Sequence, residues 1–178
     1  HIRHMSNMPG RSSSRRVNHA VATIGSCKHA RRRSMAHLRQ ALAQHGPFDG
    51  LAGVSEGAAF ASYALRHHLT RGGVLGSGAQ SLRFQILFAP TSGGEKRLYE
   101  EPFRFPTLMG LGDAEPICRP AIEAEMSTMT DCSVLRHPGG HEIPPPTPKV
   151  RDQVRGFVQR FVDGVQESGA FTSSGSGA

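Results

Sequence analysis

The stretch Gly53-Val-Ser-Glu-Gly57 constrains this chain more than any other five residues. It follows the apolar run 48–54 and precedes the small-residue run 58–65, a pattern typical of a buried strand that leads into a helix. Between such elements, a G-x-S-x-G pattern predicts a very sharp turn in which the two glycines relieve backbone crowding. We therefore expect Ser55 to project from the carboxyl edge of a parallel sheet.

Two later apolar runs end in glycine-rich turns that carry Asp113 and His141. Strands of a parallel α/β sheet bring such turns to one edge of the sheet. A serine hydroxyl needs a histidine to take its proton, and that histidine needs a carboxylate to orient it. We therefore expect Ser55, Asp113 and His141 to form a catalytic triad. Asp113 could instead be a turn former, with Glu115 as the nearest alternative acid, and we expect His137 to pack or cap.

The segments around these residues resemble the FSH family of serine hydrolases, which lies within the α/β-hydrolase superfamily. The family's elbow is similar to His45-Gly-Pro-Phe-Asp-Gly-Leu-Ala-Gly-Val-Ser-Glu-Gly-Ala-Ala59. Its acid follows a strand similar to Pro106-Thr-Leu108, and its histidine closes a segment similar to His137-Pro-Gly-Gly-His141. The resemblance spans roughly residues 34–163, and the three motifs occur in the family's order.

The resemblance implies an α/β fold, namely a truncated α/β-hydrolase with a mostly parallel sheet flanked by helices. It also implies hydrolysis of a small-molecule carboxylic ester or thioester, with no metal and no organic cofactor. Ser55 would attack the carbonyl carbon, His141 would relay the proton and Asp113 would fix the imidazole. The backbone N–H of Glu56 would supply half of an oxyanion hole. Val54 and Glu56 stand where the family usually has Phe and Gln.

The sequence upstream of the elbow departs from the family pattern. Family members begin with a strand of the type Ile-Leu-x-Leu-His-Gly, and the loop that follows it supplies the second oxyanion-hole amide. Before Ser34 the only apolar run is 20–24, and no His-Gly follows it. We therefore expect a hydrolase that lacks its N-terminal strands. The alternative is a catalytically impaired, hydrolase-like fragment that acts, if at all, as a binding module.

Charge divides the chain into two parts. Residues 1–39 hold nine Lys or Arg and no acidic residue, whereas residues 40–178 carry a net charge of −2, which together give the formal charge of +7. We expect a basic, disordered leader over 1–33, a hydrolase domain over 34–165 and a flexible tail over 166–178. The leader could alternatively be an organelle transit peptide or could bind a membrane surface. Its lack of aromatic residues argues against nucleic-acid binding.

The three cysteines, Cys27, Cys118 and Cys132, are odd in number and have no C-x-x-C spacing. This usage favours a reducing compartment and argues against a zinc site. We therefore expect a cytoplasmic protein, or an organellar one if the basic leader is a transit peptide. The sequence contains no apolar run near 18 residues, so it predicts no transmembrane segment.

Apolar spacing and turn residues predict the remaining elements. The expected strands are 48–54, 82–89, 104–111 and 132–137, and the expected helices are 34–44, 56–69, 116–129 and 148–163. The last helix has the strongest signal, because Thr147 can cap it, Pro148 suits its first turn and Gly164 suits its end. Strands that alternate with helices indicate a parallel sheet.

Overall fold

A computed structural model describes residues 19–21, 28–91, 99–115 and 118–162. Within these ranges the chain forms a five-stranded sheet whose strands follow the order of the sequence, and every neighbouring pair is parallel. The strands are β1 (His19–Val21), β2 (Gly50–Val54), β3 (Phe84–Phe88), β4 (Thr107–Gly112) and β5 (Cys132–His137). The helices are α1 (Lys28–His45), α2 (Glu56–Thr70), α3 (Arg119–Met126) and α4 (Pro148–Val162), with a short 3-10 turn η1 (Ser77–Ala79).

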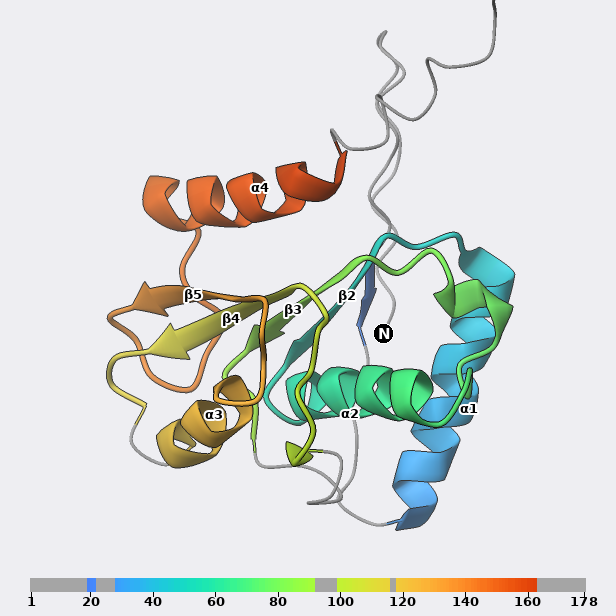
Figure 1. Cartoon of the computed structure of the whole chain (residues 1–178). Coiled ribbons are helices and arrows are strands. Elements are labelled where there is room, and N and C mark those ends of the chain that lie inside the picture. Colours follow the sequence, from blue (N-terminus) through green and yellow to red (C-terminus); the bar gives the residue numbers. More distant parts are fainter. Residues whose placement is uncertain (1–18, 22–27, 92–98, 116–117, 163–178) are drawn as a thin grey trace, which may run out of the picture.

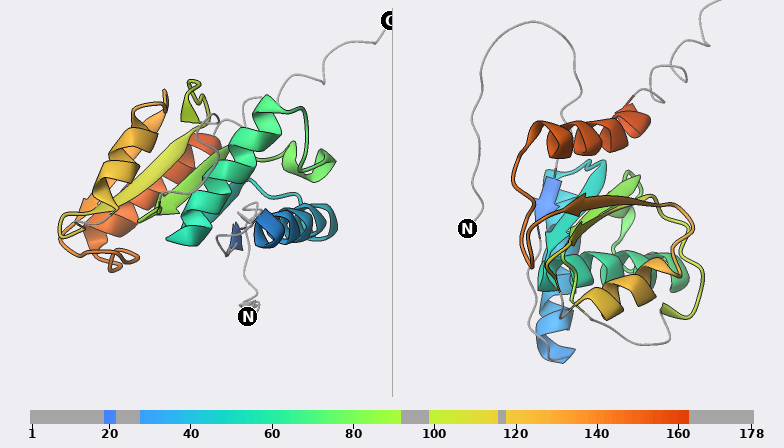
Figure 2. Two further views of the ribbon diagram at one scale, coloured as in Figure 1. Left: turned by 90° about the horizontal axis from the view of Figure 1, so that it is seen from below. Right: turned by 90° about the vertical axis from the view of Figure 1, so that its left-hand side faces the viewer.

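The helices cover both faces of the sheet. Helices α1, α2 and α3 lie on one face and α4 lies on the other (Figures 1 and 2). This arrangement confirms the expected α/β class, a parallel sheet flanked by helices. Within the described residues, no helix is both long enough and apolar enough to cross a membrane.

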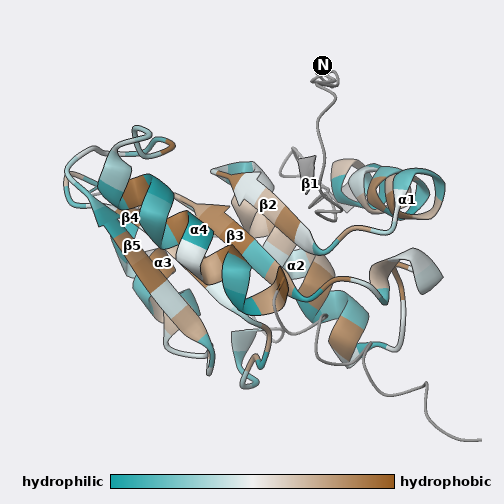
Figure 3. Ribbon diagram, turned by 90° about the horizontal axis from the view of Figure 1, so that it is seen from above, coloured by the Kyte–Doolittle hydropathy of each residue, from teal (hydrophilic) through white to brown (hydrophobic). Residues whose placement is uncertain are grey.

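Two hydrophobic clusters hold these layers together. The larger one joins α1–α3 to the sheet and includes the fully buried side chains of Leu51, Phe60 and Leu87. The smaller one lies under α4, where the ring of Phe84 meets the ring of Phe157 edge to face at 5.8 Å. Figure 3 shows the hydrophobic colouring that gathers on the central strands β2 and β3. Burial of each such side chain stabilises the fold by about 1.5–3 kcal/mol.

Helix α2 lies unusually close to strand β2. Its inner face carries Ala58, Ala61 and Ala64, and all three are fully buried. A Cβ atom added to Gly53 would lie 2.4 Å from the carbonyl oxygen of Gly57 and 2.6 Å from the Cα atom of Ala58. Because both contacts are with backbone, the strand and the helix can meet at this distance only if position 53 is glycine.

A buried polar cluster ties α2 to α3. The hydroxyl of Ser62 forms a hydrogen bond with Oε1 of Glu125, and Nη2 of Arg66 donates to Oγ1 of Thr128 at 2.8 Å. The guanidinium of Arg66 also stacks 4.7 Å from the ring centre of Tyr99. Burial raises the pKa of the Glu125 carboxyl, and the Ser62 hydroxyl and the Arg66 charge only partly oppose this shift.

The structure extends upstream of residue 34, where we expected a basic leader to end. Strand β1 pairs with β2, and α1 begins at Lys28 instead of Ser34. Arginine favours helix almost as well as leucine, and the guanidinium of Arg31 lies 4.9 Å from the ring centre of Tyr63. Helix α1 therefore begins before residue 34, the start that we expected for the hydrolase domain. The rest of the expected leader and the expected tail lie outside the described residues.

We expect Gly53→Ala to destabilise the protein by about 1–3 kcal/mol, because its methyl group would overlap backbone atoms of α2. Gly156→Ala is the matched control. A Cβ at this exposed position in α4 meets nothing within 4 Å, so the same substitution should stabilise the helix by about 0.5–1 kcal/mol. Urea unfolding of both variants measures the two changes. Equal changes in the two variants would contradict the close packing of α2 on β2.

The raised pKa of Glu125 predicts a pH-dependent stability. Its folded-state pKa lies above the ordinary value of 4.5, so the stabilisation is fully present below that pH and is lost as the pH rises through the folded-state pKa. The unfolding free energy of the wild type should therefore fall relative to that of Glu125→Gln above this pH. Urea titrations across pH measure this difference, with Glu123→Gln on the exposed side of α3 as the control. A relative gain by the wild type would mean that Arg66 lowers the pKa of Glu125.

Candidate active site

Ser55 occupies the turn between β2 and α2 in a strained backbone conformation. Its φ of 55° and ψ of −124° lie where a residue with a side chain is rarely found. The N–H of Ser55 donates to the carbonyl of Phe88 at 2.9 Å, and its carbonyl accepts from the N–H of Ala58 at 3.0 Å. These bonds hold the sharp strand-to-helix turn that the G-x-S-x-G pattern predicts.

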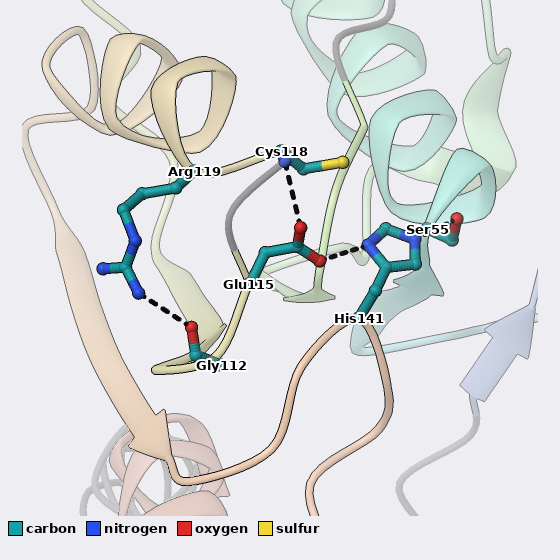
Figure 4. Close-up of polar contacts among 6 residues, drawn as sticks. All are labelled: Ser55, Gly112, Glu115, Cys118, Arg119 and His141. Carbon is teal, nitrogen blue, oxygen red and sulfur yellow. Dashed lines mark hydrogen bonds and ion pairs between the residues drawn. The ribbon is translucent and has the colours of Figure 1, made fainter.

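His141 bridges Ser55 and an acid. Its Nε2 lies 2.7 Å from Oγ of Ser55, although the two residues are far apart in the sequence. Its Nδ1 lies 2.6 Å from Oε2 of Glu115, as Figure 4 shows. The His141 side chain is 38% exposed, whereas that of Glu115 is only 2% exposed. The histidine therefore faces solvent along one side and a buried carboxylate along another.

The structure corrects the expected acid. Asp113 does not contact His141: its Oδ1 lies 3.0 Å from Nε of Arg136, and its side chain is 53% exposed. The contact that we expected for Asp113 is made by Glu115, the alternative acid. Both carboxylates follow the same strand, and the structure brings Glu115 instead of Asp113 to the histidine.

The backbone explains why Glu115, and not Asp113, contacts His141. The N–H of Asp113 still pairs with the carbonyl of His137 at 2.8 Å, and the N–H of Ala114 pairs with the carbonyl of Gly139 at 3.0 Å. The chain after β4 thus continues beside the chain after β5. A Cβ on Gly112 would lie 2.4 Å from the carbonyl oxygen of Gly139, so the two segments touch backbone to backbone. The carboxylate that meets His141 is consequently the one that follows this paired stretch.

Neighbouring groups hold the loop that follows β4 and carries Glu115, the acid loop, in place. The N–H of Cys118 donates to Oε1 of Glu115 at 3.0 Å, which leaves Oε2 for His141. Arg119 reaches back to the start of the loop, where its Nη2 donates to the carbonyl of Gly112 at 3.1 Å (Figure 4). The same Nη2 also donates to the carbonyl of Asp113 at 2.8 Å. The Cys118 amide therefore holds the Glu115 carboxylate, and the Arg119 guanidinium holds the backbone at Gly112 and Asp113.

The ring of His137 and the thiol of Cys118 also belong to the surroundings of the site. His137 is 2% exposed, and neither of its ring nitrogens has a hydrogen-bond partner among the described residues, which agrees with packing and not with proton transfer. The thiol of Cys118 lies close to the acid and the histidine: one ligand atom each from Glu115, Cys118 and His141 falls within 4.8 Å of the others. Burial, followed by the charge of Glu115, raises the pKa of this thiol.

The sequence model described as Serine hydrolase (FSH1) matches residues 21–153. The chain belongs to this family. The match begins within β1, so family membership also extends upstream of the boundary that we expected. The resemblance to the FSH serine hydrolases that we drew from the motifs is confirmed.

Curated relatives in this family are named as esterases. Esterase OVCA2 of Bos taurus is 32% identical over 135 residues, which cover 71% of this chain and 56% of the relative. An esterase of Caenorhabditis elegans is 30% identical over 137 residues, which cover 73% of this chain and 59% of the relative. The chain therefore spans somewhat more than half the length of these relatives.

Solved structures of esterases share the fold. A carboxylesterase from Mesorhizobium loti superposes with a TM-score of 0.52 at 19% identity, covering 78% of this chain and 67% of that one. A Rhizomucor miehei esterase gives a TM-score of 0.55 at 13% identity, covering 78% and 60%. At these identities the similarity establishes the α/β-hydrolase fold alone.

The geometry predicts which acid supports the reactivity of Ser55. We expect Glu115→Gln to slow labelling of Ser55 by a fluorophosphonate probe by at least about 10³-fold, because the histidine would lose its orienting carboxylate. Asp113→Asn removes only an exposed ion pair with Arg136, so labelling should change little and stability by less than about 1 kcal/mol. Labelling rates, measured with the folded variants, decide between them. A larger loss in Asp113→Asn would restore our first assignment.

Proposed function

We propose that this chain hydrolyses carboxylic esters of small molecules, with thioesters as the second substrate class, through Ser55, His141 and Glu115. The observation that carries this proposal is the continuous contact from Oγ of Ser55 to Nε2 of His141 at 2.7 Å and from Nδ1 to Glu115 at 2.6 Å. Membership of a serine hydrolase family supports the same chemistry.

The reaction follows from these contacts. Nε2 of His141 accepts the hydroxyl proton while Oγ of Ser55 bonds to the carbonyl carbon, giving a tetrahedral intermediate. His141 then returns the proton to the departing alcohol, or thiol, as the bond to the leaving group breaks. Water attacks the resulting acyl-enzyme by the same route and releases the acid. Each proton therefore passes through Nε2.

Glu115 keeps the imidazole in the form that this route needs. Its carboxylate accepts the Nδ1–H of His141, which leaves the lone pair on Nε2 facing Ser55. The carboxylate is almost completely buried, so its attraction for the imidazolium formed during the reaction is weakly screened. The N–H of Cys118 donates to the other carboxylate oxygen and so helps to hold the carboxylate in position.

The N-terminus of α2 suits the negative charge that develops on the substrate oxygen. Glu56 is the first residue of α2, where backbone N–H groups have no acceptor within the helix. We propose that the N–H of Glu56 stabilises the oxyanion, and one such donor is worth about 2.7–4 kcal/mol of the barrier. The helix dipole contributes in the same direction.

The second candidate function is a hydrolase-like fragment that binds a partner without efficient catalysis. It is favoured by one observation: no His-Gly follows the apolar run 20–24, whereas in the family the loop after such a strand supplies the second oxyanion-hole amide. In such a fragment the serine and histidine would be in contact, but the tetrahedral intermediate would receive too little stabilisation. Turnover of a simple ester separates the two candidates.

Hydrolysis of p-nitrophenyl esters of increasing chain length tests the first candidate. We expect turnover by the wild type and a loss of at least about 10³-fold in Ser55→Ala, because the nucleophile is absent. Ser127→Ala, at an exposed position after α3, is the matched control and should keep full activity. A folded wild type that is no faster than Ser55→Ala would favour the non-catalytic candidate.

A further inference from the structure

The thiol of Cys118 has no role in the proposed reaction, yet it lies beside two members of the triad, Glu115 and His141. One ligand atom from each of Glu115, Cys118 and His141 falls within 4.8 Å of the other two. Figure 4 shows that the side chains of Glu115, Cys118 and His141 lie next to one another. Cysteine spacing along the chain argued against a zinc site, because these three residues do not have the spacing of a metal-binding motif.

The three ligand atoms suit a zinc ion. Carboxylate oxygen, thiolate sulfur and imidazole nitrogen are the groups that Zn²⁺ binds in proteins, and three protein ligands leave a fourth position open. Bonds of about 2.0–2.3 Å place neighbouring ligand atoms roughly 3–4 Å apart. Closing the site around an ion therefore needs only small side-chain rotations. The amide of Cys118 already holds Oε1 of Glu115, so the carboxylate is oriented beforehand.

We propose that Zn²⁺ binds to Oε2 of Glu115, Sγ of Cys118 and Nδ1 of His141 and thereby inhibits the hydrolase. On binding, the thiol loses its proton to solvent and the imidazole proton moves from Nδ1 to Nε2. Nε2 then carries a proton and has no free lone pair. It cannot accept the hydroxyl proton of Ser55, so Ser55 is not activated for attack. The inhibition rests on the proposed function, whereas the binding of the metal does not.

The ion has a route to its ligands, because the His141 side chain is 38% exposed. The nearly complete burial of the Glu115 carboxylate weakens the screening of its charge by water, which favours a cation. The Cys118 side chain can be shortened without removing the hydrogen bond to Glu115, because the donor of that bond is the backbone N–H.

Zinc titration of the metal-free protein in the ester assay tests the inhibition. We expect Zn²⁺ to inhibit the wild type reversibly, with activity restored by a chelator. Relative to its own activity without metal, Cys118→Ala should need at least about tenfold more Zn²⁺ than the wild type for the same fractional inhibition. Cys132→Ala removes the other cysteine of the described region and should behave as the wild type. Equal inhibition of the wild type and Cys118→Ala would overturn the proposal.

Cobalt binding tests the site without any activity. Co²⁺ should give a thiolate-to-cobalt charge-transfer band with the wild type and equally with Ser55→Ala, but not with Cys118→Ala. Glu115→Gln should bind Co²⁺ at least about tenfold more weakly. A wild type that hydrolyses no ester but gives this band would overturn the proposed function and support the metal site. A wild type without the band would overturn the metal site.

Discussion

The contact between the ends of β4 and β5 is the constraint on which the candidate site depends. Backbone hydrogen bonds continue past both strands, from Asp113 to His137 and from Ala114 to Gly139. These bonds join the segment after β4 to the segment after β5. The relative positions of Glu115 and His141 are therefore set before either side chain meets Ser55. Because the bonds are between backbone groups, they fix this geometry whatever side chains the loops carry.

Much of the fold follows from local pattern. The four longer strands and α2 lie within a few residues of where apolar runs and glycines place them, because these segments are rich in apolar residues and stop at clear turn signals. Ser55 and His141 were predictable for the same reason, since each stands in a motif of small residues. Strand β1 and the first turns of α1 were not, because a three-residue strand has no periodicity and basic residues hide a helix start. The rest of α1 matches the helix that we expected over 34–44.

The choice of the acid shows where the sequence is insufficient. Asp113 and Glu115 both follow β4 at a glycine, and either is a plausible partner for a histidine. The decision depends on how far the pairing with the next segment continues, which is a tertiary property. Pairing that continues through Ala114 turns Asp113 outward to Arg136 and leaves Glu115 inside. The proximity of Cys118 to Glu115 and His141 is likewise a tertiary property that the sequence pattern does not reveal.

The alanine face of α2 has a consequence for how this site tolerates change. Ala58, Ala61 and Ala64 act as spacers that set the height of the helix above the sheet, and Ser55 rides on the end of that helix. A larger side chain at any of them would push the helix away from the sheet and disturb the 2.7 Å contact between Ser55 and His141. Three chemically inert methyl groups thus help to keep the nucleophile and the base in contact.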